Sequence, residues 1–418
     1  MRRLPAVLAL LGAVFALSAP ATPRLELERV VLVQRHGVRP PTVSNADIAK
    51  FADKPWPVWP VAPGELTPHG GKVVALMGKS LRGAYVRDGV LPAHGCPSPS
   101  AVIVWADQHD QRTRRSGEIL AESLAPGCGI KAAWSQAAAR DPIFGTPAEG
   151  ACRADPAAAK ASMDEATGPG GVPTPASQAA IARLQTILAP KACNGGAGTC
   201  LADIREEDAI GGGQMGPQFR GPTFTTFTLA EDIYLEYVEG MPMADVGWGR
   251  ATPADIRAVM PVHERVFDLF RREVYSDDRR GASMARVILA ALSGAPITAI
   301  PGAGPNAKVL ALAGHDGNLA IMAGVFGLEW TLPDQPDATA PATTLAFELW
   351  KDPASGKAYV RPVLYYDAME QMRALTPALA HKLPLHFKDC DDGPMGSCPL
   401  ETLRARIEAA IPPDCGGI

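Results

Sequence analysis

A short basic run stands at the end of the first strand that the sequence predicts. Arg35 and Arg39 flank His36, and the apolar, β-branched stretch 29–34 comes directly before them. Guanidinium groups are permanently charged, and their forked donors match the oxygens of a phosphate group. A histidine between two such groups is placed to attack the phosphorus atom that they hold. Taken alone, such a run is more often a basic loop with a structural histidine.

Two further predicted strands are also followed by charged or titratable side chains that suit phosphate binding. The stretch 308–313 leads directly to His315 and Asp316, and the stretch 101–105 leads through polar residues to Arg112. Side chains at the carboxyl ends of parallel strands point into the crevice where α/β proteins bind ligands. We therefore expect arginines, histidines and one carboxylic acid to meet at one edge of a sheet, a composition that suits phosphate transfer.

The elements that must position these residues follow from hydrophobic periodicity. Strands are predicted at 29–34, 101–105, 308–313, 345–349 and 359–365, and helices at 71–89, 175–188, 229–239 and 283–292. Strands that alternate with helices predict an α/β fold with a mostly parallel central sheet flanked by helices.

The segment 152–263 differs in character from the rest of the chain. Its connections are rich in alanine, proline and glycine, and strand signals are few. We expect it to form an inserted, smaller, mainly helical domain, with residues 25–151 and 264–418 forming the α/β domain. Residues 193–221 hold many glycines and few apolar residues, and are expected to be loop.

The first 21 residues have the pattern of a secretory signal peptide. Two arginines precede an uncharged apolar run at 4–17, and Ala19, Pro20 and Ala21 give the small-x-small pattern of a cleavage site. The run is shorter than the ~20 residues of a membrane span, and no later segment is apolar over that length. We expect an exported chain that has no membrane contact after signal cleavage.

Composition narrows the possible partners. The net charge is −4, without the basic excess that nucleic-acid binding requires. The eight cysteines of an exported chain indicate disulfides, although spacing alone does not choose among their pairings. The other six histidines show no metal-ligand spacing and are expected to be surface or packing residues: His69, His94, His109, His263, His381 and His386.

Together these motifs resemble the histidine acid phosphatase family, which is the branch of the histidine phosphatase superfamily that includes bacterial periplasmic phytases and glucose-1-phosphatases. The family motif RHGxRxP stands at 35–41, and its HD motif at His315 and Asp316. Further matching segments stand at 59–61, 66–71, 110–114, 240–242, 247–249 and 330–333, so the resemblance covers nearly the whole mature chain.

The resemblance implies a role for each residue of the site. His36 is the expected nucleophile that becomes phosphorylated, and Asp316 the expected proton donor to the leaving oxygen. The expected phosphate clamp consists of Arg35, Arg39, Arg112 and His315. No metal or other cofactor is expected, because the arginines supply the positive charge. Since Asp316 must be protonated when it acts, an acid pH optimum is predicted.

Three more residues match substrate-binding positions of the family. These are Thr42, Glu231 and Arg280. Asp232 stands beside Glu231 and leaves the register there open, and a solvated charge on a surface turn is the alternative interpretation of Arg280.

The expected activity is hydrolysis of small phosphate monoesters. Gly37 favours a phytase-like enzyme acting on myo-inositol hexakisphosphate, because glucose-1-phosphatases carry asparagine at this position. A glucose-1-phosphatase or a broad-specificity sugar-phosphate phosphatase is the alternative. Val43 and Gly317 stand where the best-known periplasmic phytase has a lysine and a threonine, so the preferred ester stays open.

Two other function classes fit less well. A phosphoglycerate-mutase-like transferase would share the fold and the phosphohistidine, but that activity is cytoplasmic. A phosphate-binding protein without activity would have lost His36 or Asp316, and both are present. We expect a monomer in the periplasm that binds a small phosphate ester, with full secretion as the alternative location.

The cysteine pattern also matches the related phytases. The pairs that it implies are Cys96 with Cys128, Cys152 with Cys415, Cys193 with Cys200, and Cys390 with Cys398.

Overall fold

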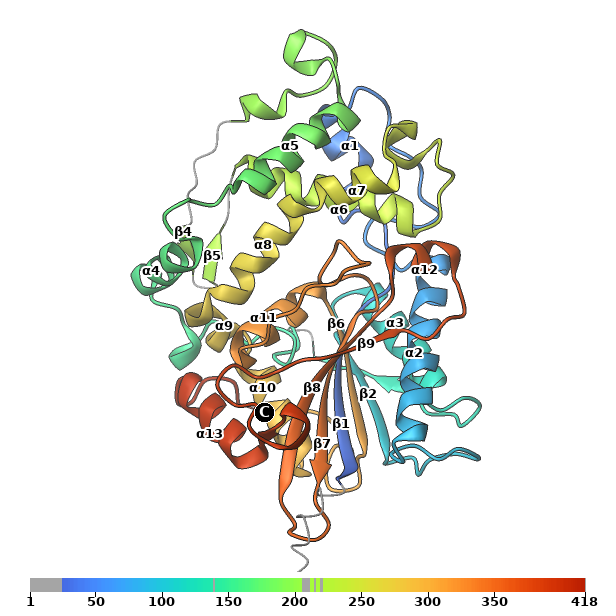
Figure 1. Cartoon of the computed structure of the whole chain (residues 1–418), viewed down its shortest axis with the longest axis vertical. Coiled ribbons are helices and arrows are strands. Elements are labelled where there is room, and N and C mark those ends of the chain that lie inside the picture. The colour runs from blue at the N-terminus through green and yellow to red at the C-terminus, as the bar shows by residue number, and fades with distance from the viewer. Residues whose placement is uncertain (1–24, 138–139, 205–210, 214–215, 219–220, 418) are drawn as a thin grey trace, which may run out of the picture.

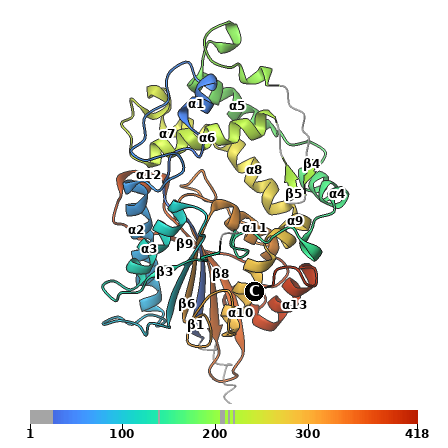
Figure 2. The same cartoon turned by 180° about the vertical axis from the view of Figure 1, so that it is seen from behind.

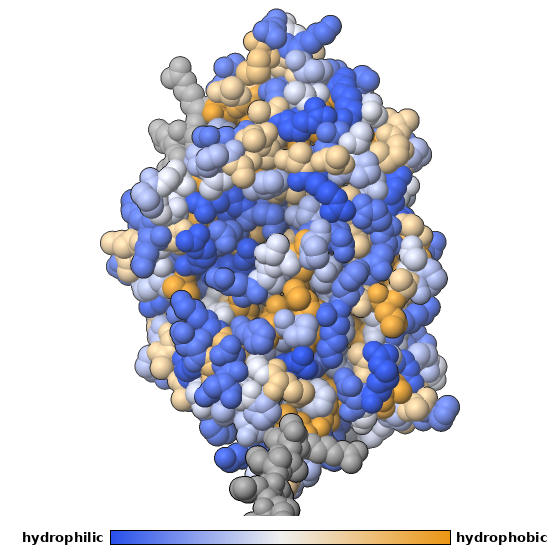
Figure 3. All heavy atoms as spheres, viewed as in Figure 1, coloured by the Kyte–Doolittle hydropathy of each residue, from blue (hydrophilic) through white to orange (hydrophobic). Residues whose placement is uncertain are grey.

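The computed structural model describes residues 25–137, 140–204, 211–213, 216–218 and 221–417 (Figure 1). The expected signal peptide lies outside the described residues. Among those described, none of the helices combines the length and the apolar character needed to span a bilayer. Hydrophilic side chains cover most of the face shown in Figure 3, and apolar ones gather there in small separate areas.

An eight-stranded sheet forms the centre of the larger part of the molecule. Its order is β10-β8-β7-β1-β6-β2-β3, and β9 pairs with β8. The strands are β1 (Glu26–Arg35), β2 (Val102–Ala106), β3 (Ala132–Ala133), β6 (Val309–Gly314), β7 (Thr344–Lys351), β8 (Ala358–Tyr366), β9 (His381–Pro384) and β10 (Cys398–Pro399). The neighbours β1, β6, β2 and β3 are parallel, and the pairs made by β7 to β10 are antiparallel.

The predicted α/β class and the five predicted strands are confirmed, but the sheet is mixed rather than mostly parallel. The difference arises at the connection of β7 and β8. Only a short turn joins them, closed by hydrogen bonds from Asp352 N to Lys357 O and from Gly356 N to Asp352 O. Gly356 has a φ of 72°, which favours glycine. Parallel strands need a longer crossover, so these two strands form a hairpin.

Helices cover both faces of the sheet (Figures 1 and 2). On β1, Val30 and Leu32 pack in one apolar cluster with α2 (Pro68–Arg87) and α3 (Gln111–Leu124). Val31 and Val33 pack in a second cluster with three other helices. These are α10 (Ala282–Ser293), α11 (Asp316–Phe326) and α13 (Leu400–Ala410). Burial on both faces explains why the sequence of β1 is apolar without alternation.

A mainly helical region lies beside the carboxyl ends of the parallel strands (Figure 1). Its helices are α1 (Asn45–Ile48), α4 (Pro156–Thr167), α5 (Pro175–Leu188), α6 (Pro222–Val238), α7 (Pro253–Val259), α8 (Pro261–Arg272) and α9 (Val274–Arg280), and α12 (Met369–Ala374) lies near α6. Residues of α5, α6 and α7 belong to the same apolar cluster as α2 and β1. The domain division at 152 and 263 stays a prediction, and α8 runs through its second boundary.

One prediction for this region was wrong. Part of the expected loop 193–221 forms a two-stranded antiparallel sheet of β4 (Gly211–Gly213) and β5 (Gly216–Gln218). Pairing here uses backbone groups of glycine-rich strands, so no side-chain alternation marks it in the sequence.

Four disulfides join Cys96 with Cys128, Cys152 with Cys415, Cys193 with Cys200, and Cys390 with Cys398. These are the pairs that the family resemblance implied. No cysteine among the described residues is free. The bond between Cys152 and Cys415 spans 263 residues of sequence and ties the C-terminal segment to the chain that follows β3.

We predict that replacing both cysteines of a disulfide by serine costs more stability when the disulfide closes a longer loop of chain. Removing the pair Cys152 and Cys415, which are 263 residues apart, should cost about 5 kcal/mol on the chain-entropy model. Removing Cys193 and Cys200, 7 residues apart, should cost about 2 kcal/mol. Urea unfolding of both variants measures the difference, and equal losses would refute the loop-length explanation.

Candidate active site

Three strand ends bring the predicted site residues together. Arg35 at the end of β1 is in register with Gly314 at the end of β6. The amide of His36 donates to Gly314 O at 2.9 Å, and the amide of Asp107, just after β2, donates to Ala313 O at 2.9 Å. The two family motifs therefore lie side by side, as their positions after parallel strands predict.

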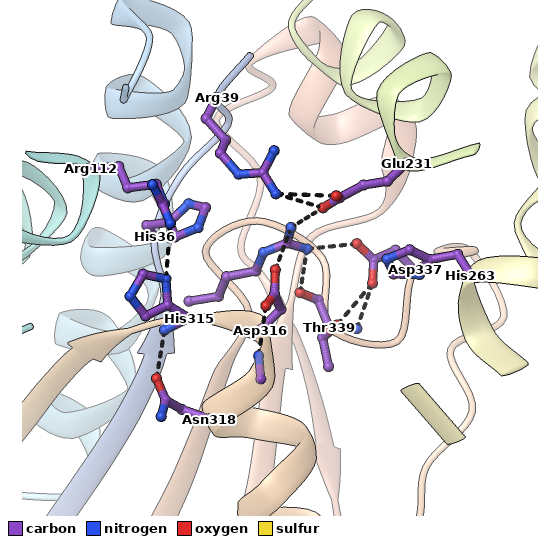
Figure 4. A network of polar contacts seen from close by, with 12 residues as sticks. His36, Arg39, Arg112, Glu231, His263, His315, Asp316, Asn318, Asp337 and Thr339 are labelled. Carbon is purple, nitrogen blue, oxygen red and sulfur yellow. Dashed lines mark hydrogen bonds and ion pairs between the residues drawn. The ribbon is translucent and has the colours of Figure 1, made fainter. Parts of the chain in front are cut away.

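Arg35 is the buried centre of the site. Its NH1 donates to Asp337 Oδ2 and to Thr339 O, both at 2.8 Å. Its NH2 lies 2.9 Å from Asp316 Oδ2 and also pairs with Glu231 (Figure 4). Burial alone would lower the pKa of Arg35, but the three carboxylates outweigh it and raise the pKa. The guanidinium is fixed in position and stays charged.

His36 is buried beside Arg35 with its ring held in one tautomer. Its Nδ1 lies 2.8 Å from Gly37 O. A carbonyl oxygen only accepts, so Nδ1 carries the hydrogen and Nε2 keeps a free lone pair. Burial lowers the pKa of His36 well below its usual range, and the charges of Arg112, Arg35, His315 and Arg39 act in the same direction. The ring is therefore neutral, which is the nucleophilic form.

Arg39 and Arg112 lie near His36, and both charges act on its ring (Figure 4). Arg39 is buried, and its NH2 lies 3.1 Å from Glu231 Oε2. Arg112, in the first turn of α3, donates from NH1 to Gly64 O at 3.1 Å. The Nε–H groups of Arg35, Arg39 and Arg112 are buried and have no hydrogen-bond partner among the described residues. Three donors of the site are thus left for an anion.

His315 is oriented by two acids that follow β2. Its Nε2 lies 3.0 Å from Asp107 Oδ2 and 3.5 Å from Asp110 Oδ2. Its ring centroid lies 5.5 Å from that of His36. Asp110 also pairs with Arg112 at 3.0 Å. The acids fix the ring of His315 and the guanidinium of Arg112 against each other at the edge of the site.

Asp316 begins α11 and is only partly buried. One oxygen lies 2.9 Å from Arg35 NH2, and the other accepts a hydrogen bond from the amide of Gly317 at 2.7 Å. Burial alone would raise the pKa of Asp316, but the charges of Arg35, Arg39 and His315 outweigh it and hold the pKa below its usual range. The carboxylate is ionised in the unliganded site.

The neighbouring carboxylates Glu231 and Asp232 on α6 lie in different surroundings. Glu231 bridges Arg35 and Arg39, whereas Asp232, although buried, makes no ion pair with either arginine. Burial outweighs other effects at Asp232 and raises its pKa well above the usual range. At Glu231 burial would also raise the pKa, but the two arginines lower it. The helical region thus contributes a carboxylate to the arginines of the site.

Of the other two residues expected to contact substrate, Thr42 lies near the site and Arg280 is paired elsewhere. Thr42 is exposed and lies beside Gly64, whose carbonyl accepts from Arg112. Arg280 pairs with Asp277 and lies over the ring of Phe270. Among the described residues, no ion pair joins Arg280 to the carboxylates that surround Arg35. Its side chain is 19% exposed, so it is not a freely solvated charge either.

Sequence reasoning missed Asp107 and Asp337. Asp107 stands two residues after the predicted strand 101–105, a position that could have singled it out. Asp337 lies in the connection between α11 and β7, 302 residues after its partner Arg35, and no local pattern marks it.

His263 is a packing residue, as expected, but it also lies close to Glu264 and Asp337. Ligand atoms of these three residues lie within 4.8 Å of one another, a spacing that could suit a metal ion. Asp337 already accepts from Arg35 and Thr339, and Glu264 Oε1 accepts from the amide of Ala338. A cation beside charged Arg35 would be repelled, so the trio does not suit a metal.

Comparison with known proteins agrees with this arrangement. The profile of the histidine phosphatase superfamily (branch 2) matches residues 26–167. Phytase AppA of Escherichia coli is 32% identical over 416 residues, which cover 95% of each chain. The glucose-1-phosphatase of Salmonella typhimurium is 25% identical over 413 residues, covering 96% of this chain and 97% of the other.

Solved structures give the same result. Hafnia alvei phytase in complex with tartrate matches with a TM-score of 0.84 and 34% identity over 95% of this chain and 99% of the other. The phytase of Citrobacter braakii matches with a TM-score of 0.83 and 30% identity over 94% and 99%. A neutral histidine among arginines at the ends of parallel strands, in this fold, defines a histidine phosphatase. The chain belongs to branch 2 of the histidine phosphatase superfamily, and it is a phosphoric monoester hydrolase.

We predict that Arg35→Met destabilises the fold in a pH-dependent way. The variant leaves Glu231, Asp316 and Asp337 without their common cation, which should cost about 3–5 kcal/mol at pH 7. In the wild type the lowered pKa values of Glu231 and Asp316 give stability that is present above pH ~4 and is lost as the pH falls through them. In the variant the pKa values rise, and protonation relieves the repulsion.

The loss should therefore be smaller at pH 4 than at pH 7. Urea unfolding at both pH values measures it. Arg257→Met is the control, because Arg257 makes a partly exposed ion pair with Glu370 and should cost under ~1 kcal/mol. An Arg35→Met loss that is the same at both pH values would contradict the charge-balance explanation.

Proposed function

We propose that this enzyme is an acid phosphatase that hydrolyses phosphate monoesters through a phosphohistidine on His36, with a phytase-like preference for myo-inositol hexakisphosphate. The observation that supports this best is the state of His36. Its ring is buried and neutral, its Nδ1 is bound to Gly37 O, and its free Nε2 lies among arginines suited to phosphate.

In the first step, Nε2 of His36 attacks the phosphorus atom. A nitrogen–phosphorus bond forms while the bond from phosphorus to the ester oxygen breaks. Arg35, Arg39, Arg112 and His315 bind the phosphate oxygens and stabilise the charge that spreads over them in the transition state. Nδ1–H remains bonded to Gly37 O, which keeps the ring in line with the phosphorus.

The leaving oxygen takes a proton from Asp316. This carboxylate is ionised in the free site, so it must gain a proton once the substrate is bound. A phosphate dianion neutralises the arginines that hold the pKa of Asp316 down, and therefore raises that pKa. Mild acid then supplies the proton, from which an acid pH optimum follows.

In the second step, water attacks the phosphorus atom of the phosphohistidine. The nitrogen–phosphorus bond breaks, the Asp316 carboxylate accepts a proton from the water, and inorganic phosphate leaves. His36 returns to its neutral form. Over the cycle one ester and one water become one alcohol and one phosphate, and no metal takes part in either step.

The relatives support the phytase-like preference, since both Escherichia coli AppA and the Hafnia alvei enzyme are named phytases. A sugar-phosphate phosphatase is the second candidate. Val43, which follows Thr42, is apolar and 45% exposed, and a side chain on Gly317 would meet nothing within 4 Å. Neither position therefore supplies a polar side chain that could bind an inositol polyphosphate, which favours the second candidate.

We further propose that the enzyme acts as a monomer in the periplasm. His36, Asp316 and the four residues expected to bind phosphate already contact one another or common partners within one chain, which supports a monomer. Four disulfides support an oxidising compartment.

The activity can be tested by phosphate release from phytate, glucose 1-phosphate and p-nitrophenyl phosphate between pH 4 and 7, with His36→Ala as the blank. We expect the highest kcat/KM for phytate and an acid optimum. A higher value for glucose 1-phosphate would support the sugar-phosphate alternative. Release from none of the three above the blank would overturn the enzymatic proposal.

Asp316→Asn should separate the proton donor from the nucleophile. An alkyl phosphate needs the proton in its first step, because an alkoxide leaves poorly, whereas p-nitrophenolate leaves without one. The first step should therefore slow by about 10²–10⁴-fold for glucose 1-phosphate and much less for p-nitrophenyl phosphate. Rapid-quench measurement of alcohol release tests this, and equal slowing of both substrates would argue against the acid role of Asp316.

A further inference from the structure

A second polar pocket lies next to the active site, at the carboxyl ends of β2 and β3. Its volume is about 330 Å³. The loop that follows β2 forms one wall and the segment that follows β3 forms the other. The lining residues are Gln108, His109, Arg114, Trp134, Ser135, Gln136, Ala137 and Arg140.

The pocket is basic. Arg114, Arg140 and His109 line it, and no acidic residue does. Arg140 is exposed and makes no hydrogen bond or ion pair with its side chain among the described residues. A guanidinium group can donate two parallel hydrogen bonds to two oxygens of one phosphate. The imidazole of His109 and the indole N–H of Trp134, which also line the pocket, are further possible donors. The lining thus has the composition of an anion site.

The acids nearest to the pocket are committed elsewhere. Asp107 binds His315 at 3.0 Å, and Asp110 binds Arg112 at 3.0 Å. Asp141 accepts from Trp105 Nε1 at 2.7 Å and from the amide of Ile143 at 2.9 Å. These carboxylates therefore already have hydrogen-bond or ion-pair partners other than the arginines of the pocket.

The walls of the pocket are tied to each other and to the active site. Gln108 Nε2 donates to Ala137 O at 2.8 Å, and Arg114 NH1 donates to Gln108 O. Gln108 directly follows Asp107, whose carboxylate holds His315. Burial would raise the pKa of Asp107, but its bonds to His315 and to the amide of His109, together with the charge of Arg140, lower it. The pocket thus shares a wall with Asp107, the residue that holds His315.

We propose that this pocket binds a second, non-scissile phosphate of a polyphosphorylated substrate while His36 attacks the first. This inference rests on the proposed function and names the substrate class more closely. A multiply phosphorylated inositol carries several dianionic groups around one ring, so one of them can reach a neighbouring pocket. On this proposal Arg140 supplies the cation for the second phosphate, and His109 is a further polar side chain beside it.

The test uses Arg140→Gln and His109→Gln in the full mature chain. Each variant should raise KM for phytate, by about 5–20-fold for Arg140→Gln, because it loses a charged hydrogen bond to phosphate. Two sets of constants should change by less than about twofold: kcat for phytate, and both kcat and KM for p-nitrophenyl phosphate. The reason is that a single phosphate occupies only the arginine cluster of the catalytic site, which consists of Arg35, Arg39 and Arg112.

Arg87→Gln is the matched control. Arg87 is an exposed arginine at the end of α2, a helix of 20 residues. The helix begins beside the active site, because Thr67, the residue before it, donates from Oγ1 to Val38 O. Arg87 at the other end of α2 therefore lies about 30 Å from the site along the helix axis. The control should leave KM unchanged for both substrates. An equal rise of the phytate KM in Arg87→Gln would show a general effect of net charge and overturn the pocket.

A binding measurement separates this inference from the catalytic proposal. Calorimetric titration with myo-inositol hexakis-sulfate should give weaker binding in Arg140→Gln than in the wild type, whereas the inhibition constant of orthophosphate should be unchanged. If orthophosphate weakens equally, Arg140 acts on the arginine cluster and the second subsite is refuted. If the wild type binds the sulfate through Arg140 but hydrolyses nothing, the catalytic proposal fails and the pocket stands.

Discussion

The buried charge of Arg35 is the constraint on which the site depends. A guanidinium without solvent is tolerated only when carboxylates and hydrogen-bond acceptors surround it. Arg35 obtains them from three separate places: Glu231 on α6, Asp316 at the start of α11, and Asp337 in the connection before β7. The compensation of one charge thus fixes the helical region, the HD motif and a long loop against the end of β1.

The same positive field lowers the pKa of both groups of the reaction, with opposite consequences for their readiness to react. It lowers the pKa of His36, which keeps the ring neutral and ready to attack. It also lowers the pKa of Asp316, which leaves the acid without its proton. Only a substrate that brings two negative charges reverses the second effect while it is held by the arginines. Substrate binding and protonation of the acid are therefore coupled, and free enzyme has its acid in the inactive form.

Much of this could be predicted from sequence, because strand periodicity and residue type carry local information. Arg35, His36, Arg112 and His315 all follow predicted strands, and parallel pairing of those strands brings them together. Asp337 could not be predicted, since its place depends on packing over 302 residues of chain. The antiparallel half of the sheet and the pairing of Gly211–Gly213 depend on connection length and backbone bonds, which a search for alternating side chains does not detect.

The central claim is that His36 forms a covalent bond to phosphorus through Nε2. Alkaline quenching of the enzyme during turnover of ³²P-labelled substrate, followed by peptide mapping and NMR of the labelled peptide, tests it most directly. The account predicts label on the peptide that contains His36, at Nε2, and none in His36→Ala. Label on another residue, on Nδ1, or turnover without any labelled protein would contradict it.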